Sequence, residues 1–334
     1  MNDNIPGNVL RAKDLKKWFP LSGGFFRGIF AKGSTRYLKA VDGVSFTIGP
    51  GEVLGLVGES GCGKTTTGMT ITKLYEPTSG QIFFSNQELA AIKGRERLKA
   101  FRKNVQIVFQ NPYESLNPRF TVFRSVEEPV RIHYPNSGEE RYERVVRSLE
   151  NAGLVPAHAF LDRYPHELSG GQLQRVAIAR AIAVAPRFLV ADEPVSMLDV
   201  SIRAGILNLL KYLSGQFGLG ILYISHDLST MKHVCTSIGV MYLGRIVEMG
   251  SPRQILGAPQ HPYTRALVAA VPVMAGRSQR KRILLEGAVP NPIDLPPGCR
   301  FHARCPKAMP PCAEREPELT PMGEGRQVAC HLYN

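Results

Sequence analysis

The sequence contains no long hydrophobic run. Its apolar stretches, such as Phe188 to Ala191, have the length of a strand, whereas a membrane-spanning helix needs roughly 18 apolar residues. The first residues, Met1 to Asn4, are polar and acidic, without the basic flank and apolar stretch of a signal peptide. These absences argue against a membrane-spanning or exported chain and predict a soluble protein that stays in the cytoplasm.

Arginine-rich repeats and interleaved aromatic residues are also missing, although the formal net charge is +13. Residues 1–40 hold eight Lys or Arg against two Asp, and residues 93–103 hold six against one Glu. Basic faces suit phosphates or an anionic membrane surface as well as nucleic acid, and either cluster is equally compatible with solvated surface charge. We expect no nucleic-acid partner.

Cysteine is scarce and unevenly placed. Only six cysteines occur, and four of them fall in the last 36 residues, namely Cys299, Cys305, Cys312 and Cys330. A reducing cytosol disfavours disulfides, and clustered thiols there more often bind a metal or a cluster.

Strand-like and helix-like segments alternate along the chain. Strands are expected at residues 8–19, 44–48, 52–57, 188–191 and 221–225, and helices at 64–74, 140–152, 171–184 and 202–216. A surface loop is expected around Ser22 to Gly33. The alternation predicts a mainly parallel sheet covered by helices.

The composition changes near the end of the chain. Residues 289–321 hold nine prolines, which disfavours a packed helix or a central strand there. We expect a boundary near residue 258, a connecting helix around Tyr263 to Ala270, and then a small, loop-rich domain that carries the four cysteines.

A complete phosphate-binding pattern, G-x-x-x-x-G-K-[ST], spans Gly58 to Thr65 between an expected strand and helix. Its glycines let backbone N–H groups close around a phosphate, Lys64 supplies a positive charge, and the Thr65 hydroxyl can ligate Mg²⁺. The expected nucleotide-binding residues of this loop are Gly58, Glu59, Ser60, Gly61, Cys62, Gly63, Lys64, Thr65 and Thr66.

A second apolar strand, Phe188 to Ala191, ends in two adjacent carboxylates. Asp192 can hold the metal's water shell, and Glu193 can polarise an attacking water. Acids at a strand end are usually only solvated caps, but a phosphate loop in the same chain favours this functional role. A guanine-reading Asn-Lys-x-Asp motif is absent, which disfavours a GTPase, whereas these motifs alone leave a kinase of the same fold open.

The pentapeptide Leu168 to Gln172 opens a helix rich in small residues, 20 residues before Asp192. It resembles the signature motif of ABC ATPases, which contacts the γ-phosphate of ATP held by the opposite subunit. This resemblance decides against a kinase and implies a head-to-tail nucleotide sandwich. In it Ser169, Gly170, Gly171 and Gln172 would act on the partner's nucleotide.

Other segments resemble further motifs of the same family. Gln110 resembles the Q-loop glutamine, which reaches the metal and the nucleophilic water. Asp199 lies in a segment similar to the D-loop, where Met197 replaces the usual alanine. His226 resembles the switch histidine that holds the γ-phosphate. An upstream aromatic residue usually stacks on adenine; Phe19 is preferred here, with Trp18 and Tyr37 as alternatives.

Three further segments resemble the oligopeptide/dipeptide importer branch of ABC ATPases: Gln110 to Arg119, His261 to Thr264, and Gly298 to Pro306 with the cysteines that follow. The resemblance implies an α/β P-loop NTPase with a RecA-like core, an antiparallel β subdomain, a helical subdomain and a small Cys-rich C-terminal domain. The expected boundaries are 1–257 for the nucleotide-binding domain, about 112–184 for its helical subdomain, and 258–334 for the C-terminal domain.

The resemblance also implies the activity and the partners. It predicts Mg²⁺-dependent ATP hydrolysis that drives uptake of peptides or a related small solute. The implied partners are a second ABC ATPase, two transmembrane permease subunits and an extracytoplasmic solute-binding protein. The two ATPases are expected to form a heterodimer, with a homodimer as the alternative, and this chain would be peripheral on the cytoplasmic face of the inner membrane. The competing class is a non-transport ABC ATPase of DNA repair or translation, but the zinc-hook, coiled-coil and tandem-ATPase insertions typical of that class are missing.

The four clustered cysteines, spaced C-x5-C-x6-C-x17-C, are expected to bind one metal centre. Zinc is chemically reasonable, but zinc sites usually show paired C-x2–4-C knuckles, which are absent. The wider spacing fits a [4Fe–4S] cluster better, and some peptide-importer ATPases carry such a cluster in a similar domain. Zinc and unligated thiols remain the alternatives.

Overall fold

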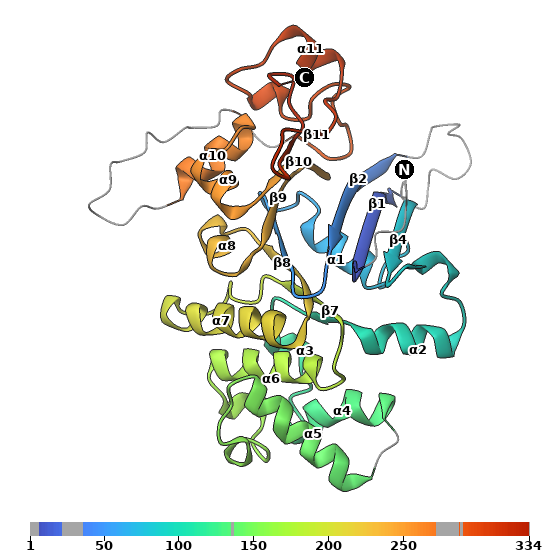
Figure 1. Ribbon diagram of the computed structural model, residues 1–334, viewed down its shortest axis with the longest axis vertical. Coiled ribbons are helices and arrows are strands. Elements are labelled where there is room, and N and C mark those ends of the chain that lie inside the picture. The colour runs from blue at the N-terminus through green and yellow to red at the C-terminus, as the bar shows by residue number, and fades with distance from the viewer. Residues whose placement is uncertain (1–6, 22–35, 135–136, 272–286, 288–289, 334) are drawn as a thin grey trace, which may run out of the picture.

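The structure is a computed structural model that describes residues 7–21, 36–134, 137–271, 287 and 290–333. The loop expected around Ser22 to Gly33 lies outside these residues. A group of helices occupies one end of the molecule, the C-terminal segment occupies the other, and two sheets lie between them (Figure 1).

The larger sheet has a parallel centre. Its order within the described residues is β11-β12-β10-β9-β3-β8-β7-β6, and the five strands from β9 to β6 run parallel. These five strands are β9 (Ser237–Tyr242), β3 (Val53–Val57), β8 (Gly220–Ser225), β7 (Phe188–Asp192) and β6 (Val105–Val108). Every residue of β3, β7 and β8 is buried, as their continuous apolar sequences require for strands covered on both faces. The predicted parallel sheet is confirmed.

A smaller antiparallel sheet lies beside it, in the order β2-β1-β4-β5. Its strands are β1 (Leu10–Pro20), β2 (Tyr37–Ile48), β4 (Ser79–Phe84) and β5 (Gln87–Glu88). Leu10 pairs with Ile48 on one side and with Phe84 on the other, and all three side chains join a core shared with β3 and β8. This shared core fixes the small sheet against α1 (Lys64–Ile71), the helix that follows the phosphate loop.

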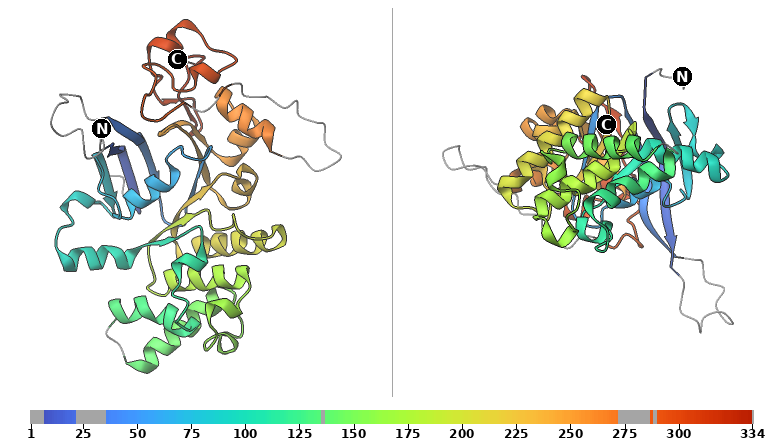
Figure 2. Two further views of the ribbon diagram at one scale, coloured as in Figure 1. Left: turned by 180° about the vertical axis from the view of Figure 1, so that it is seen from behind. Right: turned by 90° about the horizontal axis from the view of Figure 1, so that it is seen from below.

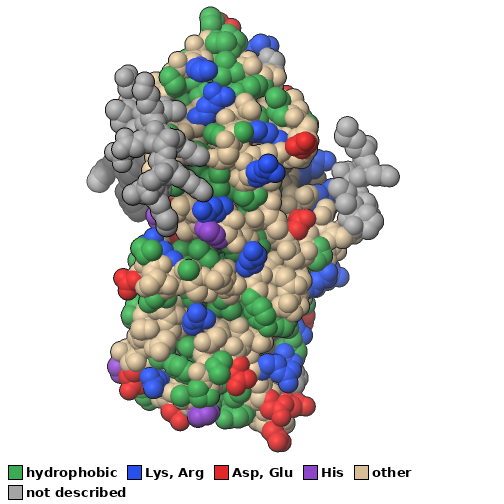
Figure 3. Space-filling view, turned by 60° about the vertical axis from the view of Figure 1, so that its left-hand side comes forward, with side chains coloured by type: hydrophobic (Ala, Val, Ile, Leu, Met, Phe, Trp, Pro, Cys, Tyr) green, Lys and Arg blue, Asp and Glu red, His purple; other side chains and the backbone are tan. Residues whose placement is uncertain are grey.

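Helices α4 (Val122–His133), α5 (Gly138–Asn151), α6 (Gly170–Ile182) and α7 (Val200–Phe217) lie together at the end away from the C-terminus (Figure 2). Fully buried Val126, Leu149 and Leu173 pack in one core cluster, which explains why α4, α5 and α6 form one unit. Acidic side chains gather at this lower end in Figure 3, where α5 carries exposed Glu139, Glu140 and Glu143. The helices predicted at 64–74, 140–152, 171–184 and 202–216 are present.

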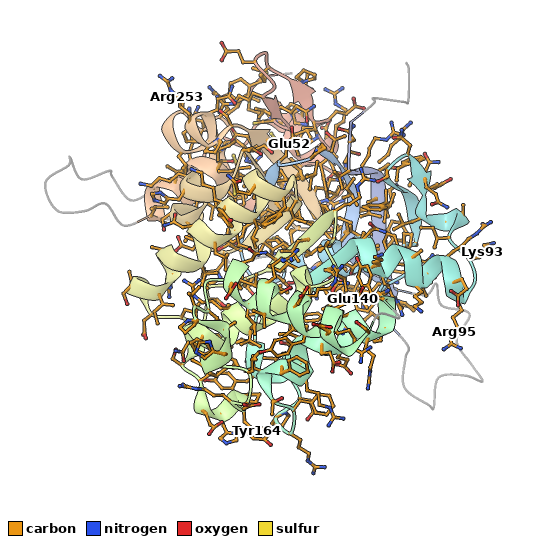
Figure 4. The ribbon with its side chains drawn as sticks, turned by 60° about the horizontal axis from the view of Figure 1, so that its bottom comes forward. Glu52, Lys93, Arg95, Glu140, Tyr164 and Arg253 are labelled. Atoms are coloured by element: carbon orange, nitrogen blue, oxygen red, sulfur yellow. The ribbon has the colours of Figure 1, made fainter. Side chains whose placement is uncertain are left out.

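Three further helices are shorter, and none of the described helices is both long and apolar enough to cross a membrane. They are α2 (Arg95–Asn104), α3 (Pro112–Ser115) and α8 (Leu228–Val234). The basic cluster around α2 is at the surface, and Lys93 and Arg95 project away from the body of the molecule in Figure 4.

The C-terminal segment joins the larger sheet. It comprises α9 (Pro252–Gly257), α10 (Pro262–Ala270), α11 (Pro310–Glu314), β11 (Thr320–Pro321) and β12 (Gln327–Val328). Strand β12 pairs with β10 (Arg245–Gly250), where Val328 faces Glu248 across the ladder. Phe301 is 1% exposed and lies in the core cluster shared with β8 and β9. The expected connecting helix is present as α10. The expected separate Cys-rich domain is not shown, since Phe301 belongs to a shared core and β12 extends the larger sheet.

Candidate functional site

The phosphate loop connects β3 to α1 and makes close backbone contacts. A Cβ at Gly58 would lie 2.1 Å from the carbonyl oxygen of Met241, and one at Gly63 would lie 2.0 Å from that of Ala40. Gly63 also has a φ of 102°, in the left-handed region. Only glycine satisfies both constraints, and this is the physical reason for the glycine pattern.

Lys64 folds back over this loop. Its Nζ donates to the carbonyl oxygens of Gly58 at 2.8 Å and Glu59 at 3.1 Å, and the residue is only 5% exposed. The same ammonium would reach the β- and γ-phosphates of a bound nucleotide. The loop is therefore shaped for a polyphosphate.

Asp192 and Thr65 meet beside the loop. Thr65 Oγ1 donates to Asp192 Oδ1 at 3.1 Å, across 127 positions of sequence. Burial raises the pKa of Asp192 to about 6. The charge of Glu193 also raises this pKa, whereas the hydrogen bond from Thr65 and the charge of Lys64 lower it. A hydroxyl at the N-terminus of α1 and a carboxylate at the end of β7 are suitable oxygen ligands for Mg²⁺.

Glu193 lies between two polar side chains from other elements. Its Oε2 is 3.2 Å from Gln110 Nε2 and 2.9 Å from His226 Nδ1. Glu193 has a φ of 46°, uncommon for a non-glycine residue, and its N–H is held by the Ile224 carbonyl at 2.9 Å. Glu193 therefore contacts the other two residues predicted as catalytic, at the carboxyl ends of β6, β7 and β8.

The signature-like residues form a capping box at the start of α6. Ser169 Oγ accepts the Gln172 N–H at 3.3 Å, and Gln172 Oε1 accepts the Ser169 N–H at 3.0 Å. A Cβ at Gly171 would lie 2.5 Å from Ile202 Cγ2 of α7, so this glycine allows the two helices to approach. Asp199 is exposed at the N-cap of α7, and the exposed fractions of Met197 and Val200 beside it are 61% and 78%.

The three aromatic candidates for adenine lie together on β1 and β2. Phe19 packs edge to face on Tyr75, with ring centroids 5.4 Å apart. Trp18 contacts Tyr37 at 6.1 Å and donates its indole N–H to Asp42 Oδ1 at 3.0 Å. All three rings have aromatic neighbours, so these contacts do not distinguish the candidates, and the preference for Phe19 stays a prediction.

The four C-terminal thiols influence one another. Burial, together with the charges of Cys312, Cys330 and Cys305, raises the pKa of Cys299 to about 11 against a backbone hydrogen bond from Phe301. A backbone N–H group points at each of the four sulfurs. The Lys307 N–H lies 3.4 Å from Cys305 Sγ, and the Met309 N–H lies 3.5 Å from Cys312 Sγ. The Phe301 N–H bonds to Cys299, and the Leu332 N–H bonds to Cys330. Among the described residues, however, no three or more His, Cys, Asp or Glu side chains form a group that could hold a metal ion. The predicted metal centre is not confirmed.

One set of contacts to the phosphate loop was missed by the sequence analysis. Arg304 of the C-terminal segment forms a bidentate ion pair with the Glu59 carboxylate. The Tyr263 hydroxyl accepts a hydrogen bond from the Glu59 N–H. Glu59 and Arg304 are 245 positions apart, and no local pattern relates them.

The parallel sheet carries a phosphate loop and a strand that ends in two acids, and the second acid, Glu193, contacts Gln110 and His226. This combination defines a P-loop ATPase. The comparisons with known proteins narrow this class. Residues 41–196 match the family model described as ABC transporter, and residues 247–312 match the one described as oligopeptide/dipeptide transporter, C-terminal region. The chain belongs to the ABC transporter family of ATP-binding proteins, and its reaction is ATP hydrolysis.

Relatives with curated names match nearly the whole chain. An oligopeptide transport ATP-binding protein, AppF, of Bacillus subtilis is 47% identical over 98% of this chain and 98% of its own. A dipeptide transport ATP-binding protein, DppF, of Escherichia coli is 46% identical over 96% of this chain and 93% of its own. The solved structure of the ATP-binding cassette MJ0796 bound to ADP and Pi is 30% identical, with a TM-score of 0.62 over 73% of this chain and 99% of that one.

Proposed function

We propose that the chain is the ATP-hydrolysing subunit of an importer for oligopeptides, dipeptides or a related small solute. The contact of Glu193 with Gln110 and His226 beside the phosphate loop carries the catalytic part of this proposal. The transport part is supported by the match of residues 247–312 and by the printed names of the relatives.

Each residue of the site has a defined task in hydrolysis. Backbone N–H groups of the loop and Lys64 bind the phosphates of ATP, and Phe19 stacks on adenine. Thr65, Asp192 and Gln110 would hold Mg²⁺, which offsets the negative charge of the phosphates when bound. Glu193 accepts a proton from the attacking water, Gln110 orients that water, and His226 donates a hydrogen bond to the γ-phosphate.

A second ABC ATPase completes the site. Ser169, Gly170, Gly171 and Gln172 would bind the nucleotide held by that partner, and Asp199 would lie at the shared interface. The large exposed fractions of Met197 and Val200 beside Asp199 support an interface there. All motifs are intact in this chain, so its contributions to both composite sites are complete, and a heterodimer with a similar ATPase is the arrangement we propose.

The remaining partners follow from the importer function. Two membrane permease subunits would bind this chain at the cytoplasmic face of the membrane, and an extracytoplasmic binding protein would deliver the solute. The non-transport alternative, an ABC ATPase of nucleic-acid or translation processes, is not favoured because the relatives are named as transport proteins.

Co-purification tests the assembly. The full chain, expressed with its neighbouring genes and isolated from detergent-solubilised membranes, should be recovered with a second ATPase and two permease subunits. A stable monomer that hydrolyses ATP without cooperativity and associates with no membrane protein would contradict the proposal.

We also propose that Cys299, Cys305, Cys312 and Cys330 bind a [4Fe–4S] cluster. The support is the proximity of the four cysteines and the backbone N–H groups directed at their sulfurs, because such N–H groups stabilise thiolates. A four-iron cluster holds its thiolates farther apart than a single ion does, so it does not require the compact ligand group that a zinc ion needs.

Metal analysis decides between the alternatives. Protein purified without oxygen should be brown and contain about four irons per chain with matching sulfide. One zinc per chain would show that the four cysteines bind zinc and not a cluster. Folded, metal-free protein with four titratable thiols would refute both interpretations.

A further inference from the structure

The C-terminal segment contacts the phosphate loop directly. Arg304 Nη1 donates to Glu59 Oε2 at 2.8 Å, and Nη2 donates to Oε1 at 3.1 Å. The Arg304 side chain is 8% exposed and the Glu59 side chain is 28% exposed, so this bidentate ion pair is largely removed from solvent. Such geometry makes a strong, directional ion pair.

A second contact fixes the backbone of the same residue. The Glu59 N–H donates to the Tyr263 hydroxyl at 2.9 Å, and Tyr263 is fully buried. The Tyr263 ring packs against those of Tyr242 and Phe301, with centroids 4.7 Å and 5.4 Å away. Because both the side chain and the backbone of Glu59 are held, the loop has little freedom to rotate at this position.

Apart from Tyr263 of α10, the residues that hold this region lie on one short stretch, residues 299–305. Arg300 pairs with Asp42 of β2, and Phe301 fills the aromatic cluster next to Tyr263. Arg304 follows three residues later and reaches the loop. This stretch therefore joins the small sheet, α10 and the phosphate loop into one unit.

The negative charge of Glu59 bears on nucleotide binding. Glu59 places a carboxylate inside a loop that receives a polyphosphate, and like charges at close range repel. Arg304 neutralises this carboxylate and holds it on the side of the C-terminal segment. Without Arg304, the carboxylate would be unpaired and free to turn toward the phosphates.

We propose that Arg304 is a positioning residue for ATP binding, through which the C-terminal segment holds the phosphate loop in its nucleotide-receiving form. Its role does not depend on a cluster at the four thiols. By thermodynamic reciprocity, bound MgATP should also hold residues 299–305 more firmly.

Substitution of Arg304 tests this proposal, with MgATP binding to the full chain measured by titration calorimetry. Arg304→Ala should weaken binding about tenfold, within the usual range of coupling between sites. Arg304→Lys keeps the charge but loses the bidentate geometry, so it should fold normally and show a smaller loss. Glu59→Gln in the Arg304→Ala background should recover most of the affinity, because the uncompensated carboxylate is then gone.

Arg245→Ala is the matched control. Arg245 also joins the ATPase core to the C-terminal segment, through Glu316 at 3.0 Å, but it has no contact with the phosphate loop among the described interactions. It should leave the MgATP dissociation constant unchanged. Parental affinity in Arg304→Ala, an equal loss in Arg245→Ala, or no recovery in the double variant would overturn the proposal.

Hydrogen exchange gives a readout that is independent of affinity. MgATP should slow amide exchange in residues 299–305 of the parent and have a much smaller effect in Arg304→Ala at saturating nucleotide. Equal protection in both proteins would count against the coupling.

Discussion

At the scale of residues, the site depends on side chains that are far apart in sequence and close in space. Lys64, Asp192 and Glu193 could be predicted from the phosphate-loop pattern and from the two acids at the end of an apolar strand. Gln110 and His226 could be predicted from their resemblance to the Q-loop and switch motifs of ABC ATPases. The Arg304 contact could not be predicted, since a charged residue in a Pro-rich segment has many possible partners. The role of Phe19 stays a prediction, because two neighbouring aromatic residues satisfy the same pattern.

Glu193→Gln should retain MgATP binding and lower kcat at least about 100-fold, because an amide cannot accept the proton of the attacking water. Steady-state hydrolysis together with a binding titration measures both effects. Glu114→Gln is a suitable control, since Glu114 lies on α3 and bonds only to Asn111 in the described contacts. Hydrolysis by Glu193→Gln at the parental rate would remove Glu193 from its assigned role.

The Asp42–Arg300 pair predicts a specific dependence of stability on pH. Burial alone would raise the pKa of Asp42, but hydrogen bonds from Arg300 and Trp18 and the charges of Arg300 and Arg245 hold the pKa below its ordinary 3.8. The pair therefore stabilises the fold above that pH, and the stabilisation is lost as pH falls through the lowered pKa.

Arg300→Met should cost about 3–5 kcal/mol at neutral pH, because it leaves a buried carboxylate without its main partner. Loss of the arginine lets burial raise the Asp42 pKa, so the difference in Tm from the parent should grow from about pH 4 to about pH 7. Adding Asp42→Asn should abolish this growth. A pH-independent difference in thermal denaturation would show that the pair has no such role.

At the scale of elements, strand β12 joins the C-terminal segment to the larger sheet. Val328 is fully buried and pairs with Glu248 of β10, whose carboxylate accepts the N–H groups of Gln260 and His261 and pairs with Arg326. A strand of two residues is too short to show the alternation of apolar and polar residues that predicts a strand, and the many prolines of this segment argue against one. Pro321 is nonetheless compatible with β11 because that strand lies at the edge of the sheet.

Val328→Ala should therefore destabilise the ATPase core together with the C-terminal segment, by about 2 kcal/mol. Calorimetry of the full chain should show one cooperative transition, shifted as a whole to lower temperature by the substitution. Two separate transitions, with only one of them shifted, would mean that the C-terminal segment unfolds as an independent domain.

At the scale of the whole molecule, the order of strands and helices was predictable because long apolar runs and a complete phosphate loop leave few alternatives. The parallel sheet and the predicted helices are present, and the antiparallel sheet expected from the family resemblance lies beside them. The lengths of edge strands and the attachment of the C-terminal segment depend on tertiary contacts, which no local pattern contains. In the proposed ATPase dimer the second half-site lies on the partner subunit, so function has to be tested on the assembly.

The most direct test of the central claim is ATP hydrolysis by the assembled complex in proteoliposomes, measured with and without its binding protein and peptide. We predict that peptide-loaded binding protein stimulates hydrolysis, that labelled peptide accumulates inside vesicles with MgATP outside, and that Glu193→Gln abolishes both. Hydrolysis that is indifferent to binding protein and peptide, with no uptake of any peptide tested, would contradict the account.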